Sequence, residues 1–128
     1  VASSTLECDT FALSNAVIDR NRALAFRALL EMKRERTDPA VLIGMLTRTY
    51  SELVSVALLS DEGADAPAIE AALKIPAFKV RMYLRTVKSH GVPRLVAALD
   101  SLTKVDAASK LGGVDGYAAV ELFLAQNL

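Results

Sequence analysis

The chain has 128 residues, the length of one domain whose hydrophobic core needs no disulfide or metal to support it. Hydrophobic residues make up 52% of the sequence, but aromatic residues make up only 5% and tryptophan is absent. The core must therefore be built from Leu, Val, Ala and Ile, a composition that suits helices better than a β-sandwich. Fifteen basic residues balance fifteen acidic ones, which excludes an attraction of the whole molecule to nucleic acid or to an anionic membrane and leaves only local contacts.

The single cysteine, Cys8, excludes an internal disulfide bond. The sequence contains neither a basic leader followed by an apolar stretch nor a run of about eighteen uncharged apolar residues. We therefore expect no membrane contact and a cytoplasmic location. The chain begins with Val1 and not with methionine, so we also expect it to be part of a longer protein.

The first nine residues, VASSTLECD, are small and polar without a sustained period, and we expect a linker or the end of a preceding domain there. A short helix is expected over residues 10–19. A second helix is expected over residues 22–36, with Asn21 as its N-cap. The residues expected to pack from these two helices are Phe11, Leu13, Ala16, Val17, Ile18, Leu24, Phe26, Leu29 and Leu30.

Residues 38–60, DPAVLIGMLTRTYSELVSVALLS, predict a long central helix. Asp38 can accept hydrogen bonds from the free N–H groups of a first turn, and Pro39 lacks the donor that this turn would leave unpaired. At roughly 100° per residue, about two-thirds of the circumference is apolar, through Val41, Leu42, Ile43, Met45, Leu46, Tyr50, Leu53, Val54, Val56, Ala57, Leu58 and Leu59. Only a narrow strip is left for water, formed by Gly44, Arg48, Ser51 and Ser55. A helix of this kind must be surrounded by others, so we predict an all-α bundle of about six to seven helices around it.

The following segment has the local spacing of a helix-turn-helix motif. Asp65 and Pro67 start a short helix, APAIEAAL, the turn Lys74-Ile75-Pro76 follows, and a second helix is expected from about Ala77 to Ser89. The inner side of that second helix is expected to contain Val80, Tyr83, Leu84 and Val87.

Arg81, Arg85 and Lys88 fall on one outward stripe of the same helix, at positions i, i+4 and i+7. In a DNA-binding protein such a stripe would contact phosphates or guanines. We favour a structural role or a contact between subunits, because a short helix, a turn and a longer helix commonly form the corner of a bundle. The stripe also lacks the cluster of Asn, Gln, Ser or Thr that reads base edges. The three residues are therefore candidates for an interface with another protein or for a DNA contact.

A leucine-spaced helix is expected over residues 93–111, with Asp106 in the middle of its apolar face. We expect Asp106 to form a buried structural pair with Lys110, one turn on, because an uncompensated buried charge costs several kcal/mol. The alternatives are that Asp106 caps a neighbouring helix or contacts another subunit. An internal structural role is preferred to a catalytic one, since no second perturbed acid or base lies nearby in sequence. His90, at the end of the preceding helix, is interpreted as a solvated partner of the helix dipole and not as a metal ligand.

Gly112 and Gly113 end that helix, and Asp115 is expected to cap the last one, residues 116–128. The segment GGVDGY lacks the spaced Gly-Lys-Ser/Thr of a nucleotide-binding loop and follows a helix, not a strand. We find no nucleophile–base pair, no set of metal ligands and no nucleotide fingerprint, so we predict no catalytic site, no metal and no cofactor. The residues by themselves indicate a soluble all-helical domain that binds another protein.

The order of these features resembles the C-terminal domain of the delta subunit of bacterial DNA polymerase III, the clamp-loader protein that opens the sliding clamp. The matching pieces are FALSNAVIDRNRALAFRALLEM, PAVLIGMLTRTYSELVSVALL, AIEAALKIPAFKVRMYLRTVKSHGVPRLVAALDSLTKVDAASKLGG and VELFLAQ. They cover nearly the whole chain from Phe11 onward. The most specific part is the end, where a leucine-spaced helix carries Asp106 and Lys110, the glycine pair follows, and an apolar helix closes the chain.

The resemblance implies that residues 10–128 are the collar domain, a non-catalytic helical module through which five clamp-loader subunits form a ring. It implies packing beside the equivalent domains of the delta-prime and gamma/tau subunits, within the DNA polymerase III holoenzyme. In that family the nucleotide-fold domain and the clamp-binding wedge precede the collar. Contacts with the sliding clamp and with primer–template DNA would then be made only through the full-length delta protein or the complex, and residues 1–9 would be the exit from the preceding lid domain.

Two other functions remain as alternatives. The first is a helix-turn-helix regulator that reads duplex DNA with the helix Ala77–Ser89; a salt-dependent affinity that falls when Arg81 and Arg85 become alanine would favour it. The second is an enzyme whose site uses Asp106, which a loss of turnover in Asp106→Asn with an intact fold would indicate.

Overall fold

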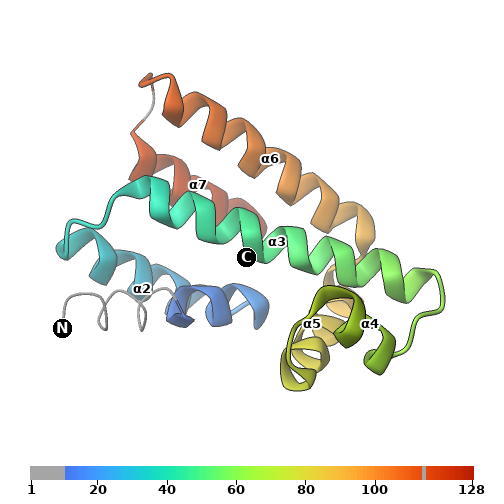
Figure 1. The fold of residues 1–128 in the computed structure, drawn as a ribbon. Helices are drawn as coiled ribbons and strands as arrows, with labels where there is room; N and C mark the ends of the chain where they lie inside the picture. The colour runs from blue at the N-terminus through green and yellow to red at the C-terminus, as the bar shows by residue number, and fades with distance from the viewer. Residues whose placement is uncertain (1–10, 114) are drawn as a thin grey trace.

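The computed structural model describes residues 11–113 and 115–128 of the chain, and all regular secondary structure in this part is α-helical (Figure 1). The predicted all-α bundle is therefore confirmed, whereas the linker predicted at residues 1–9 lies outside the described residues. The helices in chain order are a helical segment over residues 11–18, α2 (Arg22–Arg34), α3 (Pro39–Asp61), α4 (Ala66–Leu73), α5 (Ala77–His90), α6 (Val92–Lys110) and α7 (Gly116–Asn127).

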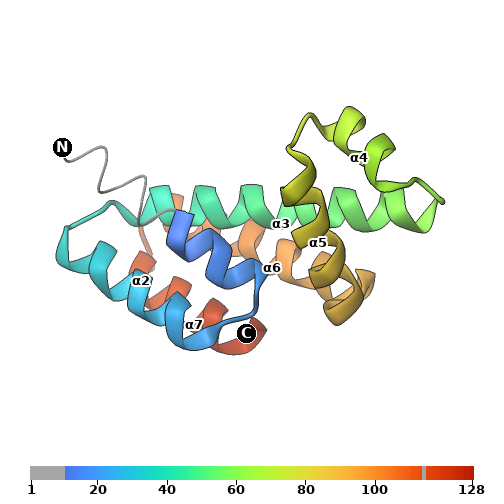
Figure 2. The same cartoon turned by 90° about the horizontal axis from the view of Figure 1, so that it is seen from below.

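Helix α3 is the centre of the bundle, as predicted, and contacts α4, α5, α6 and α7. Figure 1 shows α6 along one side of α3, and α4 with α5 beside its C-terminal half. Helix α7 contacts α2, α3 and α6 and so lies among them. Figure 2 shows the helical segment 11–18 beside α3, where the Ser14 and Thr49 hydroxyls are 3.1 Å apart. The buried residues of α3 are Leu42, Ile43, Leu46, Thr49, Tyr50, Leu53, Val56 and Ala57.

The strip of α3 predicted to face water is largely exposed, since Gly44, Arg48 and Ser51 are exposed and Ser55 is half-buried. The apolar face of α3 is less completely covered than predicted. Val41 near its start is 41% exposed and Leu58 near its end is 49% exposed. The surrounding helices thus leave apolar side chains open at both ends of the central helix.

Within the described residues, one helix, α3, is long and apolar enough to cross a membrane when judged by length and composition alone. Its most apolar 18-residue window has a mean hydropathy of 1.3. The packing of α3 among four other helices accounts for this composition, because the central helix of a bundle must be apolar on most sides.

The helix starts follow the capping residues predicted from the sequence. Asn21 Oδ1 accepts a hydrogen bond of 3.2 Å from the backbone N–H three residues later, and Asp38 Oδ1 accepts one of 2.9 Å from the N–H two residues later. Asp65 and Asp115 cap α4 and α7 in the same way. Each carboxylate or amide satisfies an N–H group that has no partner inside the first turn, so these starts are encoded locally.

Helix α2 packs only part of the side that was predicted to be covered, since Leu29 is buried and Phe26 is partly buried against the core, as expected. Leu24 and Leu30 are 47% and 50% exposed, and Phe11 of the preceding helical segment is 64% exposed, although all three were expected to pack. The buried residues of α2 are Ala25, Ala28, Leu29 and Met32. Helix α2 contacts α7, and a helix covered by its neighbours on one side leaves the residues of its other side at the surface, which is where Leu24 and Leu30 lie.

Helix α7 is held at both its start and its middle. The Tyr117 hydroxyl donates to the backbone carbonyls of Met32, at 3.3 Å, and Thr37, in the connection from α2 to α3. Farther along, the ring of Phe123 meets the ring of Tyr50 edge to face, with 5.4 Å between centroids, a favoured aromatic geometry. These contacts position one wall of the groove described next.

Candidate protein-interaction surfaces

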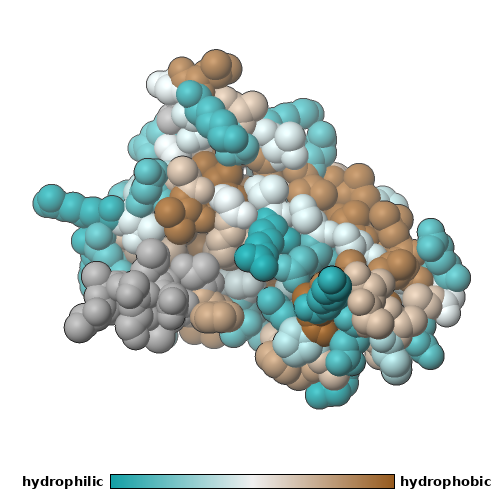
Figure 3. All heavy atoms as spheres, viewed as in Figure 1, coloured by the Kyte–Doolittle hydropathy of each residue, from teal (hydrophilic) through white to brown (hydrophobic). Residues whose placement is uncertain are grey.

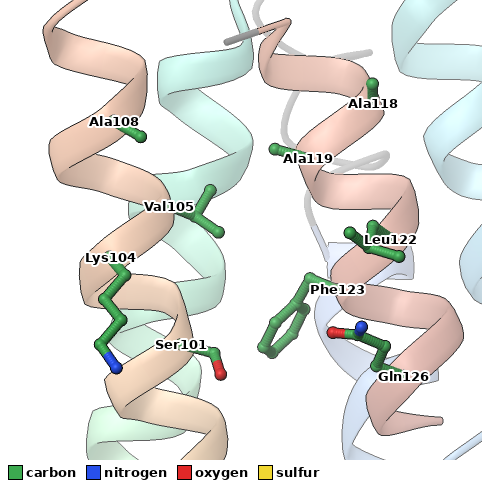
Figure 4. A pocket seen from close by; sticks show the side chains of 9 residues that line it. All are labelled: Ser101, Lys104, Val105, Ala108, Ala118, Ala119, Leu122, Phe123 and Gln126. Atoms are coloured by element: carbon green, nitrogen blue, oxygen red, sulfur yellow. The ribbon is translucent and has the colours of Figure 1, made fainter. Parts of the chain in front are cut away.

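An open groove of about 420 Å³ runs between α6 and α7 (Figure 4). In Figure 4 the Phe123 side chain points from α7 into the space between the helices, and Val105 points toward it from α6. We call this feature the α6–α7 groove. Its lining residues are Ser101, Lys104, Val105, Ala108, Ala118, Ala119, Leu122, Phe123 and Gln126.

The α6–α7 groove is mainly apolar. Alanines form one end of it, while its polar residues gather at the other end (Figure 4). The Lys104 ammonium is already paired with Asp100 Oδ2 at 3.1 Å, and Leu122 on the groove wall is 59% exposed. A groove with small and aliphatic walls and no facing acid–base pair is suited to receive the apolar ridge of another helix.

A second apolar area lies on the face of the molecule seen in Figure 3. Hydrophobic side chains gather there over the C-terminal half of α3 and the neighbouring part of α6. The exposed apolar residues of these two helices include Leu58, at 49%, and Val96, at 46%. Helix α6 therefore borders apolar surface on two sides, because it also forms one wall of the α6–α7 groove.

The basic residues singled out from the sequence lie on the outer side of α5. Arg81, Arg85 and Lys88 are exposed, and none of them makes a hydrogen bond or ion pair with another residue in the described ranges. The inner side of α5 buries Val80 and Tyr83 as predicted, while Leu84 and Val87 are half-buried and Thr86 takes a buried place. What the three cations contact stays a prediction.

The pair of Asp106 and Lys110 forms, but it is not buried. Lys110 Nζ lies 2.9 Å from Asp106 Oδ2, and the side chains of Lys110 and Asp106 are 75% and 40% exposed, respectively. The expectation of a buried pair is therefore wrong. The reason is the course of α6: its buried residues end at Leu102, and its C-terminal end diverges from α3 (Figure 1).

A polar cluster around Glu52 joins α3 to α5. Glu52 accepts a hydrogen bond of 3.0 Å from the Tyr83 hydroxyl, and Arg48 and Lys79 lie 3.5 and 4.0 Å from its carboxylate. Burial, followed by the Glu52 charge and hydrogen bond, raises the pKa of Tyr83 well above its ordinary value. The sequence indicates only the Arg48–Glu52 pair, by its i, i+4 spacing, because the contact to Tyr83 depends on how α5 crosses α3.

His90 differs from the solvated residue that the sequence suggests. Its Nε2 atom is buried without a hydrogen-bond partner in the described chain, as is the Tyr50 hydroxyl. Burial, together with the charges of Arg20 and Arg94, lowers the pKa of His90 to about 4. Burial raises the pKa of Tyr50 to about 12, so both groups are neutral at pH 7.

No three His, Cys, Asp or Glu side chains of residues 11–113 and 115–128 gather as a possible metal site. The surfaces that remain are the α6–α7 groove, the apolar area of Figure 3 and the basic stripe of α5. Their composition suits the binding of other macromolecules.

Comparison with known proteins adds a family and a fold. The model of the family described as DNA polymerase III delta subunit, C-terminal domain, matches residues 7–127. DNA polymerase III subunit delta of Bacillus subtilis (strain 168) is 20% identical over all 128 residues, which span 37% of that protein. The solved structure of the Bacillus subtilis DNA clamp loader delta protein has a TM-score of 0.81 at 20% identity, over 95% of this chain and 36% of that one. At this identity the structural likeness establishes the shared fold.

Proposed function

Because the chain belongs to the family formed by the C-terminal domains of DNA polymerase III delta subunits, we propose that residues 10–128 are the collar domain of a clamp-loader delta protein. In this role the domain holds delta beside the delta-prime and gamma/tau subunits in the ring that loads the sliding clamp during bacterial DNA replication. Its contribution is binding and not catalysis. We place the protein in the cytoplasm, where bacterial replication occurs.

The observation that carries this proposal is the open α6–α7 groove. Its walls are apolar, Leu122 is 59% exposed, and the groove occupies the space between two neighbouring helices. There a helix of the adjacent protein in the ring would place its apolar ridge and cover these side chains, as in helix-in-groove recognition. The resulting contact would remove apolar area from water, which is the main driving force of stable association.

A protein inside a ring needs a contact on each of two sides. The apolar area over α3 and α6 supplies a second surface besides the α6–α7 groove (Figure 3). Helix α6 takes part in both, so we infer that it is the principal interface helix. A stable interface buries about 800 Å² on each partner, which is more than the groove walls alone offer, so the flanking surface of α6 must also contribute.

The test is binding of this chain to purified delta-prime and gamma/tau subunits, followed by size-exclusion chromatography with light scattering. The wild-type chain is expected to elute in a complex of defined stoichiometry. Leu122→Asp places a charge in the α6–α7 groove and should weaken the complex at least tenfold. Leu24→Asp, on the exposed side of α2 at 47% exposure, is the matched control and should leave the complex unchanged.

Circular dichroism of both variants checks that their helices remain intact. Failure of the wild-type chain to bind either partner would contradict the assembly role. Equal weakening by Leu122→Asp and Leu24→Asp, with both folds intact, would contradict the use of the groove. The clamp itself is not expected to bind, because we assign that contact to parts of the full-length delta protein outside this chain.

A further inference from the structure

Helix α4 is apolar on the side turned away from the bundle. Glu70 is its single charged residue, yet Ile69 is the only residue of α4 that is buried. Among the helices named above, α4 contacts α3 and α5, and Figure 2 shows it at the outer edge of the molecule beside α5. A helix packed on one side normally carries polar residues on the other side. The exposed residues of α4 instead include Pro67, Ala68, Ala71 and Ala72.

An open hollow of about 580 Å³ lies along this outer side, between α4 and the turn that follows it. We call it the α4 hollow. Its lining residues are Pro67, Glu70, Ala71, Lys74, Ile75 and Pro76. The lining is therefore apolar except for one acid, Glu70, and one base, Lys74.

Glu70 and Lys74 do not pair with each other, although residues four apart on a helix often do. Lys74 is the residue directly after α4 and has a left-handed backbone, with a φ angle of 56°, so the chain turns away from the helix there. Neither side chain forms a hydrogen bond or an ion pair with another residue in the described part of the chain. Both charges are thus available to a partner at the α4 hollow.

The charge pattern of the α4 hollow is complementary to itself. When two copies of one surface meet about a two-fold axis, a contact of residue i with residue j is repeated as a contact of j with i. If two α4 helices lie antiparallel with the axis level with residue 72, Glu70 of each copy lies beside Lys74 of the other. The axis keeps both ion pairs on the same flank of the helix pair. The small side chain of Ala71, close to the axis, allows the two helices to approach.

We propose that this chain self-associates through the α4 hollow, with α4 of a second copy packed antiparallel against it and Glu70 of each copy paired with Lys74 of the other. Helix α4 is about 12 Å long, and a stable interface buries about 800 Å² on each partner. The contact is smaller than this, so the dimer is weak and forms reversibly at high chain concentration. The proposal does not rest on the assembly role, because α4 does not line the α6–α7 groove.

The test is sedimentation equilibrium of this chain alone at concentrations up to about 1 mM, where weak contacts of this size become populated. The wild-type chain is expected to show a reversible equilibrium between monomer and dimer. Glu70→Lys alone, or Lys74→Glu alone, places like charges opposite each other and should weaken self-association at least tenfold. An equimolar mixture of these two single variants should associate again, because every contact between the two variants joins an acid to a base.

Ala71→Gln tests the close approach of the helices. Glutamine is uncharged and has a good helix propensity, but its longer side chain should hold the two helices apart. This variant should weaken self-association at least tenfold while circular dichroism shows unchanged helix content.

The matched controls are Asp100→Lys and Lys104→Glu. These residues form an exposed acid–base pair with the same i, i+4 spacing on α6, where the side chains of Asp100 and Lys104 are 64% and 78% exposed, respectively. Each control variant, and their mixture, should change self-association less than twofold.

A chain that stays monomeric at about 1 mM would overturn the proposal. It would also be overturned if the mixture of Glu70→Lys with Lys74→Glu failed to associate, or if the control variants lost as much association as the α4 variants. Loss of self-association in Leu122→Asp, without an effect of the α4 variants, would assign the contact to the α6–α7 groove instead. Because no clamp-loader subunit is present in this experiment, its outcome is separate from that of the assembly test.

Discussion

Gly116, the first residue of α7, lies directly against Pro39, the first residue of α3. A Cβ atom on residue 116 would be 2.4 Å from the Pro39 Cβ atom and 2.9 Å from its Cγ atom. The proline ring cannot rotate away, so the starts of the two helices can meet at this distance only because residue 116 is glycine. This contact sets where α7 begins relative to the central helix.

We predict that Gly116→Ala destabilises the fold by about 1–3 kcal/mol, the usual cost of forcing an extra carbon into a packed site. Urea unfolding followed by circular dichroism measures the change. Removing the opposing carbon in the double variant Gly116→Ala with Pro39→Gly should recover part of the loss, and a double-mutant cycle would quantify this coupling. Additive effects of the two changes would contradict the close contact.

Gly44→Ala is the matched glycine substitution and should have the opposite sign. Gly44 is exposed in the interior of α3, and an added Cβ would meet nothing within 4 Å. Alanine in a helix interior is favoured over glycine by about 0.5–1 kcal/mol, so the variant should be more stable by that amount. Destabilisation of Gly44→Ala would show that its surroundings are tighter than the structure indicates.

The two buried tyrosines are predicted to respond differently to loss of the hydroxyl. The Tyr50 hydroxyl is buried without a partner in the described chain, while its ring packs on Phe123. Tyr50→Phe keeps the ring and removes an unsatisfied polar atom, so stability should be unchanged or higher by up to about 1 kcal/mol. Thermal unfolding would measure this, and a clear loss of stability would mean that the hydroxyl has a partner.

Tyr83→Phe, in contrast, should lower stability by about 1–2 kcal/mol. This change removes the hydrogen bond of 3.0 Å that the Tyr83 hydroxyl donates to Glu52. The Glu52 side chain is 20% exposed, and without this hydrogen bond its carboxylate keeps only the weaker contacts to Arg48 and Lys79. Comparison with Glu52→Gln would separate the charge from the hydrogen bond, and a neutral Tyr83→Phe would contradict a stabilising role for the pair.

His90 predicts a dependence of stability on pH. Its pKa is about 4 in the folded chain and 6.5 as the ordinary value, so between these pH values the unfolded chain binds a proton that the folded chain does not. The stabilising contribution of neutral His90 is complete above pH 6.5 and is lost as the pH falls toward 4. His90→Gln should therefore flatten the pH dependence of unfolding between pH 6.5 and 5.

His90 is the one histidine of the chain, so its ring proton resonances can be followed by NMR without assignment. The titration midpoint is expected near pH 4 and should rise in Arg94→Gln, because the Arg94 charge is one of the causes of the lowered pKa. A midpoint near 6.5 would show that the imidazole is solvated.

The Asp106–Lys110 pair is predicted to contribute little. Its exposed position and i, i+4 spacing place it among surface ion pairs, which are worth about 0–1 kcal/mol. Asp106→Asn should therefore shift the free energy of unfolding by less than about 1 kcal/mol and should leave binding to the partner proteins intact. A loss of several kcal/mol would restore the idea of a buried pair.

Helix positions in this chain could be predicted well because the signals are local. Asn21, Asp38, Asp65 and Asp115 each contact N–H groups two or three residues away, and those distances do not depend on the rest of the fold. The outward placement of the α5 cations was also predicted correctly, because charged side chains avoid burial without a partner.

The candidate surfaces could not be predicted in the same way. The α6–α7 groove is formed by residues from two helices, and neither Leu122 nor Val105 differs in sequence from an ordinary core residue. The Glu52–Tyr83 hydrogen bond joins residues 31 positions apart. Such features depend on the distance and angle between helices, which no local pattern specifies.

The sequence by itself determined an all-helical chain, its capped helix starts and a central helix that is apolar on most sides, because helix propensity, capping and periodicity act within one or two turns. Only the tertiary structure decided which apolar faces are covered. In the folded chain Leu24 and Leu30 are exposed, the Asp106–Lys110 pair lies at the surface, and the Nε2 atom of His90 is buried. The physical reason is that burial depends on two packed elements, because a leucine is covered only where another helix comes close enough to it.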